Sequence, residues 1–256
     1  MSWAAAMRTA PGLHRDWIVP DWPAPARVRA FVTTRAGGVS EGAYATLNLS
    51  VSGGDDARRV TRNREIVREV LPAMPRWMAQ VHGVSVVDVD AWTAEGVPTA
   101  DAAVTAAANR VCAVLTADCM PLLLCDTDGR RVAVAHAGWR GLAAGVVENA
   151  VDALDTKPAR VLAWMGPAIG PRAFEVGPEV REAFVARDAH AHGAFAPHTP
   201  GKYLADLYAL ARQRLAAIGV ERVWGGDFCT YHETARFFSY RREKRSGRMG
   251  AFIWMV

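Results

Sequence analysis

The chain has 256 residues, of which 51% are hydrophobic and 22% are charged, and its formal net charge is +4. This composition is typical of a globular protein with one large domain or two small ones, and no run of 18 apolar residues predicts a membrane-spanning helix. The first 25 residues lack the continuous apolar segment of a secretory signal, and the four cysteines form no CxxC pair. We therefore expect a cytoplasmic protein with neither a disulfide framework nor a structural zinc ribbon.

The predicted elements mix strands and helices along the chain. Strands are expected at residues 27–34, 77–82, 84–89, 111–117, 122–125, 131–136, 160–165, 223–224, 237–240 and 249–256. Helices are expected at residues 55–71, from 138–141 through 154, at 179–186 and at 204–218. Because strands and helices do not alternate strictly, this order predicts an α+β fold, a layered sandwich with mixed sheets, hairpins and flanking helices, and not a doubly wound parallel sheet.

The excess of basic residues is small and scattered. The densest basic run lies at residues 241–245 and is interrupted by Glu243. A nucleic-acid reader would need a clustered basic stripe with aromatic or helix-turn-helix context. We therefore expect no nucleic-acid partner and favour a local anionic ligand.

Three potential metal ligands each lie where a predicted strand meets a turn marked by glycine or proline. They are His82, Cys119 and His136. A catalytic zinc ion takes three protein ligands and keeps a fourth position open, and a thiolate favours zinc over magnesium or calcium. The spacing matches no local zinc motif such as HExxH, and a lone histidine or cysteine usually serves packing. The residues alone therefore leave both interpretations open.

The surroundings of these residues favour a site. Arg140 lies at the start of a predicted helix, where backbone N–H groups and the helix dipole suit an anion such as phosphate. Asp118 precedes Cys119 and is a candidate general acid or base, or a carboxylate that orients a ligand. An aspartate that only stabilises a turn accounts for Asp118 equally well.

Nine motifs in a fixed order make the sequence recognisable. They are TTRAGGVS (33–40), LNL (47–49), QVHG (80–83), TADC (116–119), AHAGWRG (135–141), GPAIG (166–170), FEVG (174–177), CT (229–230) and FFSYRR (237–242). In these motifs the chain resembles the YfiH-like family, also called laccase-domain or polyphenol oxidase proteins. The resemblance covers residues 27–256 and leaves 1–26 as an N-terminal extension. It implies a single-domain layered sandwich and zinc held at the positions of His82, Cys119 and His136.

The resemblance also implies an enzyme. Family members are described as purine nucleoside phosphorylases that act with phosphate on adenosine, inosine, guanosine or methylthioadenosine, and adenosine deamination is described for them as well. A zinc ion that lowers the pKa of water suits deamination, with Asp118 moving protons. Phosphorolysis needs an anion clamp, and guanidinium groups such as that of Arg140 suit phosphate. The further candidates for substrate binding are Arg35, Ser40, Asn48 and Arg242.

Other interpretations remain beside this one. A multicopper laccase needs about ten histidines, whereas the chain has seven, so copper is not favoured. A metal-dependent hydrolase that edits wrongly built muramyl–amino acid intermediates of peptidoglycan synthesis is an alternative enzyme. A basic nucleic-acid-binding protein without catalysis is the second alternative, supported by the isoelectric point of about 9.1 alone. The sequence makes no prediction about the preferred nucleoside or the oligomeric state.

Overall fold

A six-stranded mixed sheet forms the middle layer of the molecule. The computed structural model describes residues 12–256, and residues 1–11 of the expected extension lie outside the described part. The strands, in the order β11-β7-β5-β6-β3-β2, are β11 (Arg222–Gly225), β7 (Val161–Met165), β5 (Met120–Asp126), β6 (Val132–Ala137), β3 (Ala102–Thr105) and β2 (Val86–Asp88). The β11–β7 and β2–β3 pairs are parallel and the others are antiparallel.

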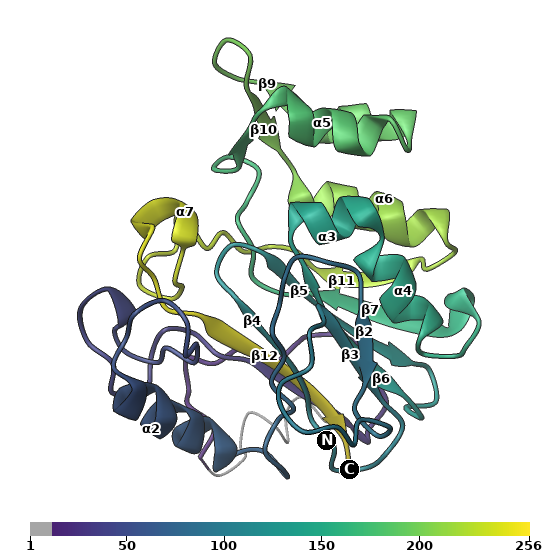
Figure 1. The fold of residues 1–256 in the computed structure, drawn as a ribbon. Helices are drawn as coiled ribbons and strands as arrows, with labels where there is room; N and C mark the ends of the chain where they lie inside the picture. The colour runs from purple at the N-terminus through teal and green to yellow at the C-terminus, as the bar shows by residue number, and fades with distance from the viewer. Residues whose placement is uncertain (1–11) are drawn as a thin grey trace.

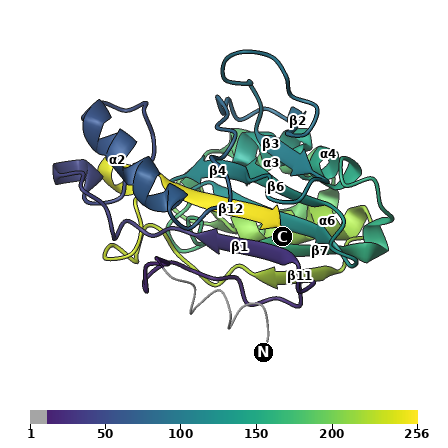
Figure 2. The same cartoon turned by 90° about the horizontal axis from the view of Figure 1, so that it is seen from below.

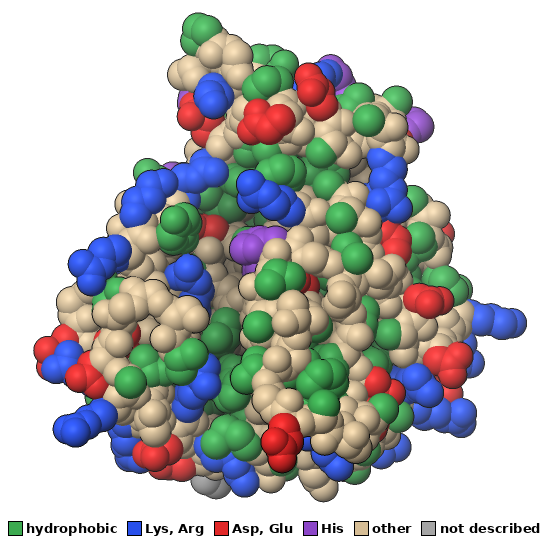
Figure 3. Space-filling view, viewed as in Figure 1, with side chains coloured by type: hydrophobic (Ala, Val, Ile, Leu, Met, Phe, Trp, Pro, Cys, Tyr) green, Lys and Arg blue, Asp and Glu red, His purple; other side chains and the backbone are tan. Residues whose placement is uncertain are grey.

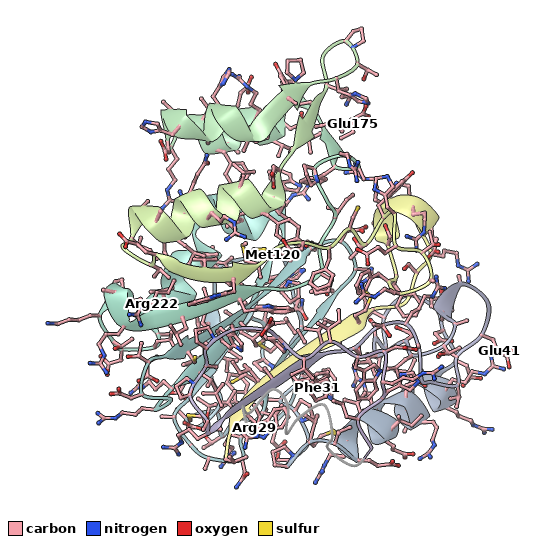
Figure 4. The ribbon with its side chains drawn as sticks, turned by 180° about the vertical axis from the view of Figure 1, so that it is seen from behind. Arg29, Phe31, Glu41, Met120, Glu175 and Arg222 are labelled. Carbon is pink, nitrogen blue, oxygen red and sulfur yellow. The ribbon has the colours of Figure 1, made fainter. Side chains whose placement is uncertain are left out.

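The two faces of this sheet are covered differently (Figures 1 and 2). One face packs against an antiparallel sheet of β1 (Val28–Val32), β12 (Met249–Met255) and β4 (Cys112–Thr116), in the order β1-β12-β4. The core between the two sheets includes Phe31, labelled in Figure 4, together with Phe252 and Trp164. The other face packs against α3 (Trp139–Ala144), α4 (Val146–Asp152) and α6 (Leu207–Ala217). Every residue of β5 is buried as a result.

A small lobe projects from the helical side of the molecule (Figure 1). It contains α5 (Pro178–Val185), the 3-10 helix η3 (Ala189–Ala194) and a sheet of β8 (Glu175–Val176), β10 (Tyr203–Ala205) and β9 (Phe195–Pro197), in the order β8-β10-β9. Phe184 and Phe195 pack together inside the lobe, with ring centroids 6.1 Å apart. This contact joins α5 to the start of β9.

The helix α2 (Ala57–Arg68) packs beside the β1-β12-β4 sheet and holds the loop at residues 46–48 in place. Asp56 caps it by accepting the backbone N–H groups of Arg58 and Arg59. Asn63, which is fully buried, donates to the backbone oxygens of Thr46 and Asn48. The remaining short helices are η1 (Gly42–Tyr44), η2 (Pro158–Arg160) and α7 (Tyr240–Glu243).

The expected α+β layered sandwich is confirmed, and so is the hairpin of 122–125 with 131–136, which β5 and β6 form. Two expected strands are wrong. Residues 77–82 form only an isolated bridge at Ala79, because a buried carboxylate and not a neighbouring strand accepts the following N–H groups. Residues 237–240 turn into α7, because the Ser239 side chain accepts the backbone N–H of Arg242.

Two further expectations are refined by the structure. The helix expected through residue 154 is broken into α3 and α4 at Gly145, which adopts a φ of 115°. The residues just before β1 pack onto the sandwich, because Trp17, Val19 and Trp22 are buried and Ile18 pairs with Val32. In the part of the chain that is described, none of the helices has the length and apolar character needed to span a bilayer.

Candidate metal centre

The three suspected ligands converge. One ligand atom from each of His82, Cys119 and His136 lies within 4.8 Å of the other two. The Cys119 sulfur lies 3.7 Å from Nε2 of His82, and the two imidazole rings have centroids 4.8 Å apart. Figure 3 shows histidine at the base of a central hollow, with Lys and Arg side chains on several sides. The arrangement is therefore a three-ligand site that opens to the surface.

His136 is oriented by a buried carboxylate. The residue lies near the end of β6, is 4% exposed, and its Nδ1 lies 2.8 Å from Oδ1 of Asp101, which is fully buried. A protonated Nδ1 donates to this carboxylate, so the lone pair of Nε2 is directed toward the site.

The same carboxylate shapes the loop that carries His82. The backbone N–H groups of Val81, His82 and Gly83 donate to Asp101 at 3.1, 2.9 and 2.7 Å. His82 has a φ of 60°, in the left-handed region that non-glycine residues rarely adopt. The Asp101 carboxylate therefore holds two of the three ligands, and the strained backbone of His82 is of the kind that occurs at functional sites.

The third ligand needs a glycine beside it. A Cβ atom at Gly138 would lie 2.6 Å from the Cys119 sulfur and 3.1 Å from Cδ2 of His82. Both distances are shorter than ordinary van der Waals contact, so any larger residue would push the thiol or the imidazole away. Gly138 leaves space in which the two ligands can face a common centre.

The charges in this cluster favour a thiolate. Burial raises the pKa of the Cys119 thiol, but the charge and hydrogen bond of His136 and the hydrogen bond of His82 outweigh burial and lower it to about 6. Burial lowers the pKa of His136, and the Cys119 thiolate together with Asp101 raises it above its ordinary value. One thiolate and two imidazoles form a donor set that suits zinc, so these residues fit the ion that the sequence predicts.

We expect Cys119 of the metal-free protein to react with iodoacetamide faster at pH 7 than the other three cysteines. With a pKa of about 6, most of the thiol is ionised at pH 7, and the thiolate is the reactive form. Its rate should fall as the pH drops through 6, because the sulfur becomes protonated. Mass spectrometry of peptides after a short pulse measures the rates. Bound zinc should protect Cys119, and equal labelling of Cys119 and Cys229 would contradict the prediction.

Asp118 lies beside the ligands, but its carboxylate is already engaged. Oδ1 accepts the hydroxyl of Thr230 at 2.6 Å, and Oδ2 accepts the backbone N–H of Arg241 at 2.7 Å. Its backbone has a φ of 84°. Asp118 thus ties the turn before Cys119 to the loop 229–230 and to the first turn of α7, and its role in proton transfer stays a prediction.

The structure does not place the guanidinium groups of Arg35 and Arg242 around one common site for an anion, because both are engaged with the protein itself. Arg35 donates to the carbonyl groups of Ala45 and Thr234. All three guanidinium nitrogens of Arg242 donate to backbone carbonyls or to Glu243. These arginines therefore join loops around the site.

Three further candidates differ in their exposure. Ser40 and Asn48 are buried, and both donate to the carboxylate of Asp55. Arg140 is exposed and lies over the ring of Trp139, at 4.4 Å from its centroid, at the start of α3, which has only six residues. The anion site expected at Arg140 therefore lies at the N-terminus of a helix of only six residues, not of the long helix that the sequence predicted.

Sequence reasoning missed Asp101 and Arg248. Asp101 directly precedes β3, whose pairing with β6 places Asp101 beside His136. No strand was predicted at 102–105, so the sequence offered no signal for this contact. Arg248 follows the basic run and lies close enough to Cys119 for the charge of the sulfur to raise its pKa, against burial, which lowers it.

Comparisons with known proteins find relatives along almost the whole chain. The family described as "Multi-copper polyphenol oxidoreductase laccase" matches residues 29–256. A purine nucleoside phosphorylase of Pseudomonas aeruginosa is 55% identical over 240 residues, covering 93% of this chain and 98% of that protein. The purine nucleoside phosphorylase YfiH of Escherichia coli K12 is 53% identical over 243 residues, with coverages of 93% and 98%. A crystal structure of a Neisseria meningitidis protein has a TM-score of 0.90 and 48% identity, and the match covers 94% of this chain and 99% of that one.

Proposed function

The chain belongs to the YfiH-like, laccase-domain family, and from this membership we propose that it is a zinc-dependent purine nucleoside phosphorylase that also deaminates adenosine. The observation that carries the proposal is the convergence of His82, Cys119 and His136, a cluster in which His82 is exposed and His136 is buried. Relatives more than half identical to this chain bear the name purine nucleoside phosphorylase. The four cysteines are free thiols, which supports a cytoplasmic location.

Zinc is the metal that we assign to the site, although the family's description refers to copper. Three side chains with one thiolate leave room for a fourth ligand, as in catalytic zinc sites. The seven histidines of the whole chain are too few for the several copper centres of a laccase. When bound, zinc would supply Lewis acidity and would lower the pKa of water.

The two proposed reactions place different demands on the chain. In phosphorolysis a phosphate oxygen bonds to C1′ of the ribose while the C1′–N9 bond breaks, and the purine leaves with the electron pair and gains a proton. In deamination the oxygen of water bonds to C6 of adenine and the amino group leaves as ammonia. Guanidinium groups at the rim, such as that of Arg140, would attract the phosphate. Asp118 would accept and return protons at its carboxylate oxygens, each of which keeps a free lone pair.

We expect the zinc-loaded protein to convert inosine and inorganic phosphate into equal amounts of hypoxanthine and ribose 1-phosphate. Chromatography of the products measures both, and omission of phosphate should reduce hypoxanthine to background. Adenosine without phosphate should yield inosine and ammonia. Release of serine from a UDP-muramyl-serine substrate, with no turnover of nucleosides, would overturn the proposal in favour of peptidoglycan-precursor editing.

A further inference from the structure

Arg248 directly precedes β12, on the side of the sheet where β4 leads into Cys119. This strand pairs with β4 so that Met249 lies opposite Thr116, and one residue further along the antiparallel ladder Arg248 faces the turn that leads into Cys119. Burial lowers the pKa of the guanidinium, and the charges of Cys119 and Asp118 act against burial. The guanidinium therefore lies within electrostatic reach of the site.

One edge of this guanidinium is fixed and the other is free. Nη1 donates to the backbone oxygens of Ser246 and Gly247, at 2.9 and 3.0 Å. The Cζ atom lies 5.6 Å from the centroid of the Tyr240 ring. Within residues 12–256, Nε and Nη2 have no hydrogen-bond acceptor, and Arg248 forms no ion pair. Two free donors on a partly buried cation suit an anionic ligand with two oxygens.

The backbone of Arg248 is held by the LNL motif. Oδ1 of Asn48 accepts the N–H of Arg248 at 3.0 Å, and the N–H of Leu49 donates to the oxygen of Arg248 at 3.2 Å. Asn48 is 1% exposed, and its amide nitrogen is occupied by Ser50 and Asp55. Asn48, which the sequence suggested as a substrate ligand, thus serves to position Arg248.

Of the other arginines expected to bind phosphate, Arg140 is exposed and has no hydrogen-bond partner among residues 12–256, whereas Arg242 and Arg35 are engaged. The guanidinium nitrogens of Arg242 are occupied by backbone carbonyls and Glu243, and those of Arg35 reach two carbonyl groups and the same glutamate. Arg248 combines uncommitted Nε and Nη2 donors with partial burial and with the charge of the Cys119 sulfur acting on it, whereas Arg140 is exposed.

We infer that Arg248 binds the phosphate co-substrate, an inference that rests on the proposed phosphorylase activity. The Nε–H and Nη2–H groups donate to two oxygens of inorganic phosphate and hold the anion beside the metal centre. A planar guanidinium matches two phosphate oxygens at once, which an ammonium group does not. Phosphate bound to Arg248 would lie on the side of the site from which β12 and β4 approach Cys119.

The test is Arg248→Gln in the zinc-loaded protein. We expect the KM for phosphate to rise about tenfold or more, since hydrogen bonds to a charged group are lost, while the KM for inosine and the zinc content stay within about twofold. Titration calorimetry with inorganic phosphate should show the same loss of affinity without any turnover. Arg248→Lys, which keeps the positive charge, should recover part of the affinity for phosphate. The matched control is Arg222→Gln, an exposed arginine on the edge strand β11 (Figure 4).

The outcomes separate this inference from the proposed function. Unchanged phosphate affinity and KM in Arg248→Gln, with turnover in the wild type, would overturn the role of Arg248 and leave the activity standing. Loss of zinc from both Arg248 variants would also overturn it, because Arg248 would then support the metal ligands. A wild type that binds phosphate through Arg248 without turning over inosine would overturn the proposed function instead.

Discussion

Replacing Cys119 with alanine is expected to leave the purified protein almost without zinc and to lower kcat/KM for inosine by more than about 100-fold. Loss of a group that only supports a ligand typically costs about 10–100-fold in metal affinity, so loss of the ligand itself should cost more. The two remaining imidazoles lack the soft, negatively charged donor that favours zinc. Elemental analysis of the protein and the phosphorolysis assay measure the two effects.

The control for this prediction is Cys112→Ala. Cys112 lies in β4 and is fully buried, away from the ligand cluster. We expect this variant to keep its zinc and its activity, and to lose about 1 kcal/mol of stability because a small cavity replaces the thiol. Full zinc content and full turnover in Cys119→Ala would show that Cys119 does not bind the metal.

The layered architecture was predictable where strands are buried or strictly paired. The apolar run 122–125, the turn after it and the returning strand predict the β5–β6 hairpin that carries His136. The helix α5 of the lobe was predicted at 179–186, but the sheet of the lobe was not predictable, because β8, β9 and β10 have only two or three residues each. Strands of this length carry too few residues to show a period. The strand predicted at 237–240 was wrong for another reason. Buried aromatic residues such as Phe237 and Phe238 occur both in strands and in the segment that leads into a helix, so their pattern does not distinguish the two.

The sequence predicted the three metal ligands, but it did not predict the residues that surround and orient them. His82, Cys119 and His136 carry side chains whose chemistry is visible in the sequence, and the family resemblance selects them. The contacts of Asp101, and the position from which we infer the role of Arg248, arise only from the pairing of β3 with β6 and of β4 with β12. Residues brought together by strand pairing across long stretches of chain leave no local pattern. For this reason the sequence predicted Arg35, Arg140 and Arg242, which lie within the recognised motifs, as phosphate or substrate ligands and did not predict Arg248.

Asp101 supports both histidine ligands, and Asp101→Ala is expected to weaken zinc binding about 10–100-fold. His136 would lose the acceptor that fixes its Nδ1–H, and the loop of His82 would lose three hydrogen bonds. Because the Nδ1–H of buried His136 would be left unpaired, at a cost of about 1–3 kcal/mol, the melting temperature should also fall by about 5 °C. Chelator competition measures the metal affinity, and calorimetry measures the melting temperature.

A second buried carboxylate separates the two effects. Asp126, at the far end of β5, is 5% exposed and accepts the backbone N–H groups of Asp128, Arg130 and Arg131. Asp126→Ala should therefore destabilise the fold to a similar degree, yet keep the zinc affinity of the wild type, since Asp126 contacts no ligand. If both variants lose zinc in proportion to their lost stability, metal loss reflects loosening of the whole sandwich. If only Asp101→Ala loses zinc, the buried carboxylate orients the ligands, and the metal affinity of this fold depends on a residue that never touches the ion.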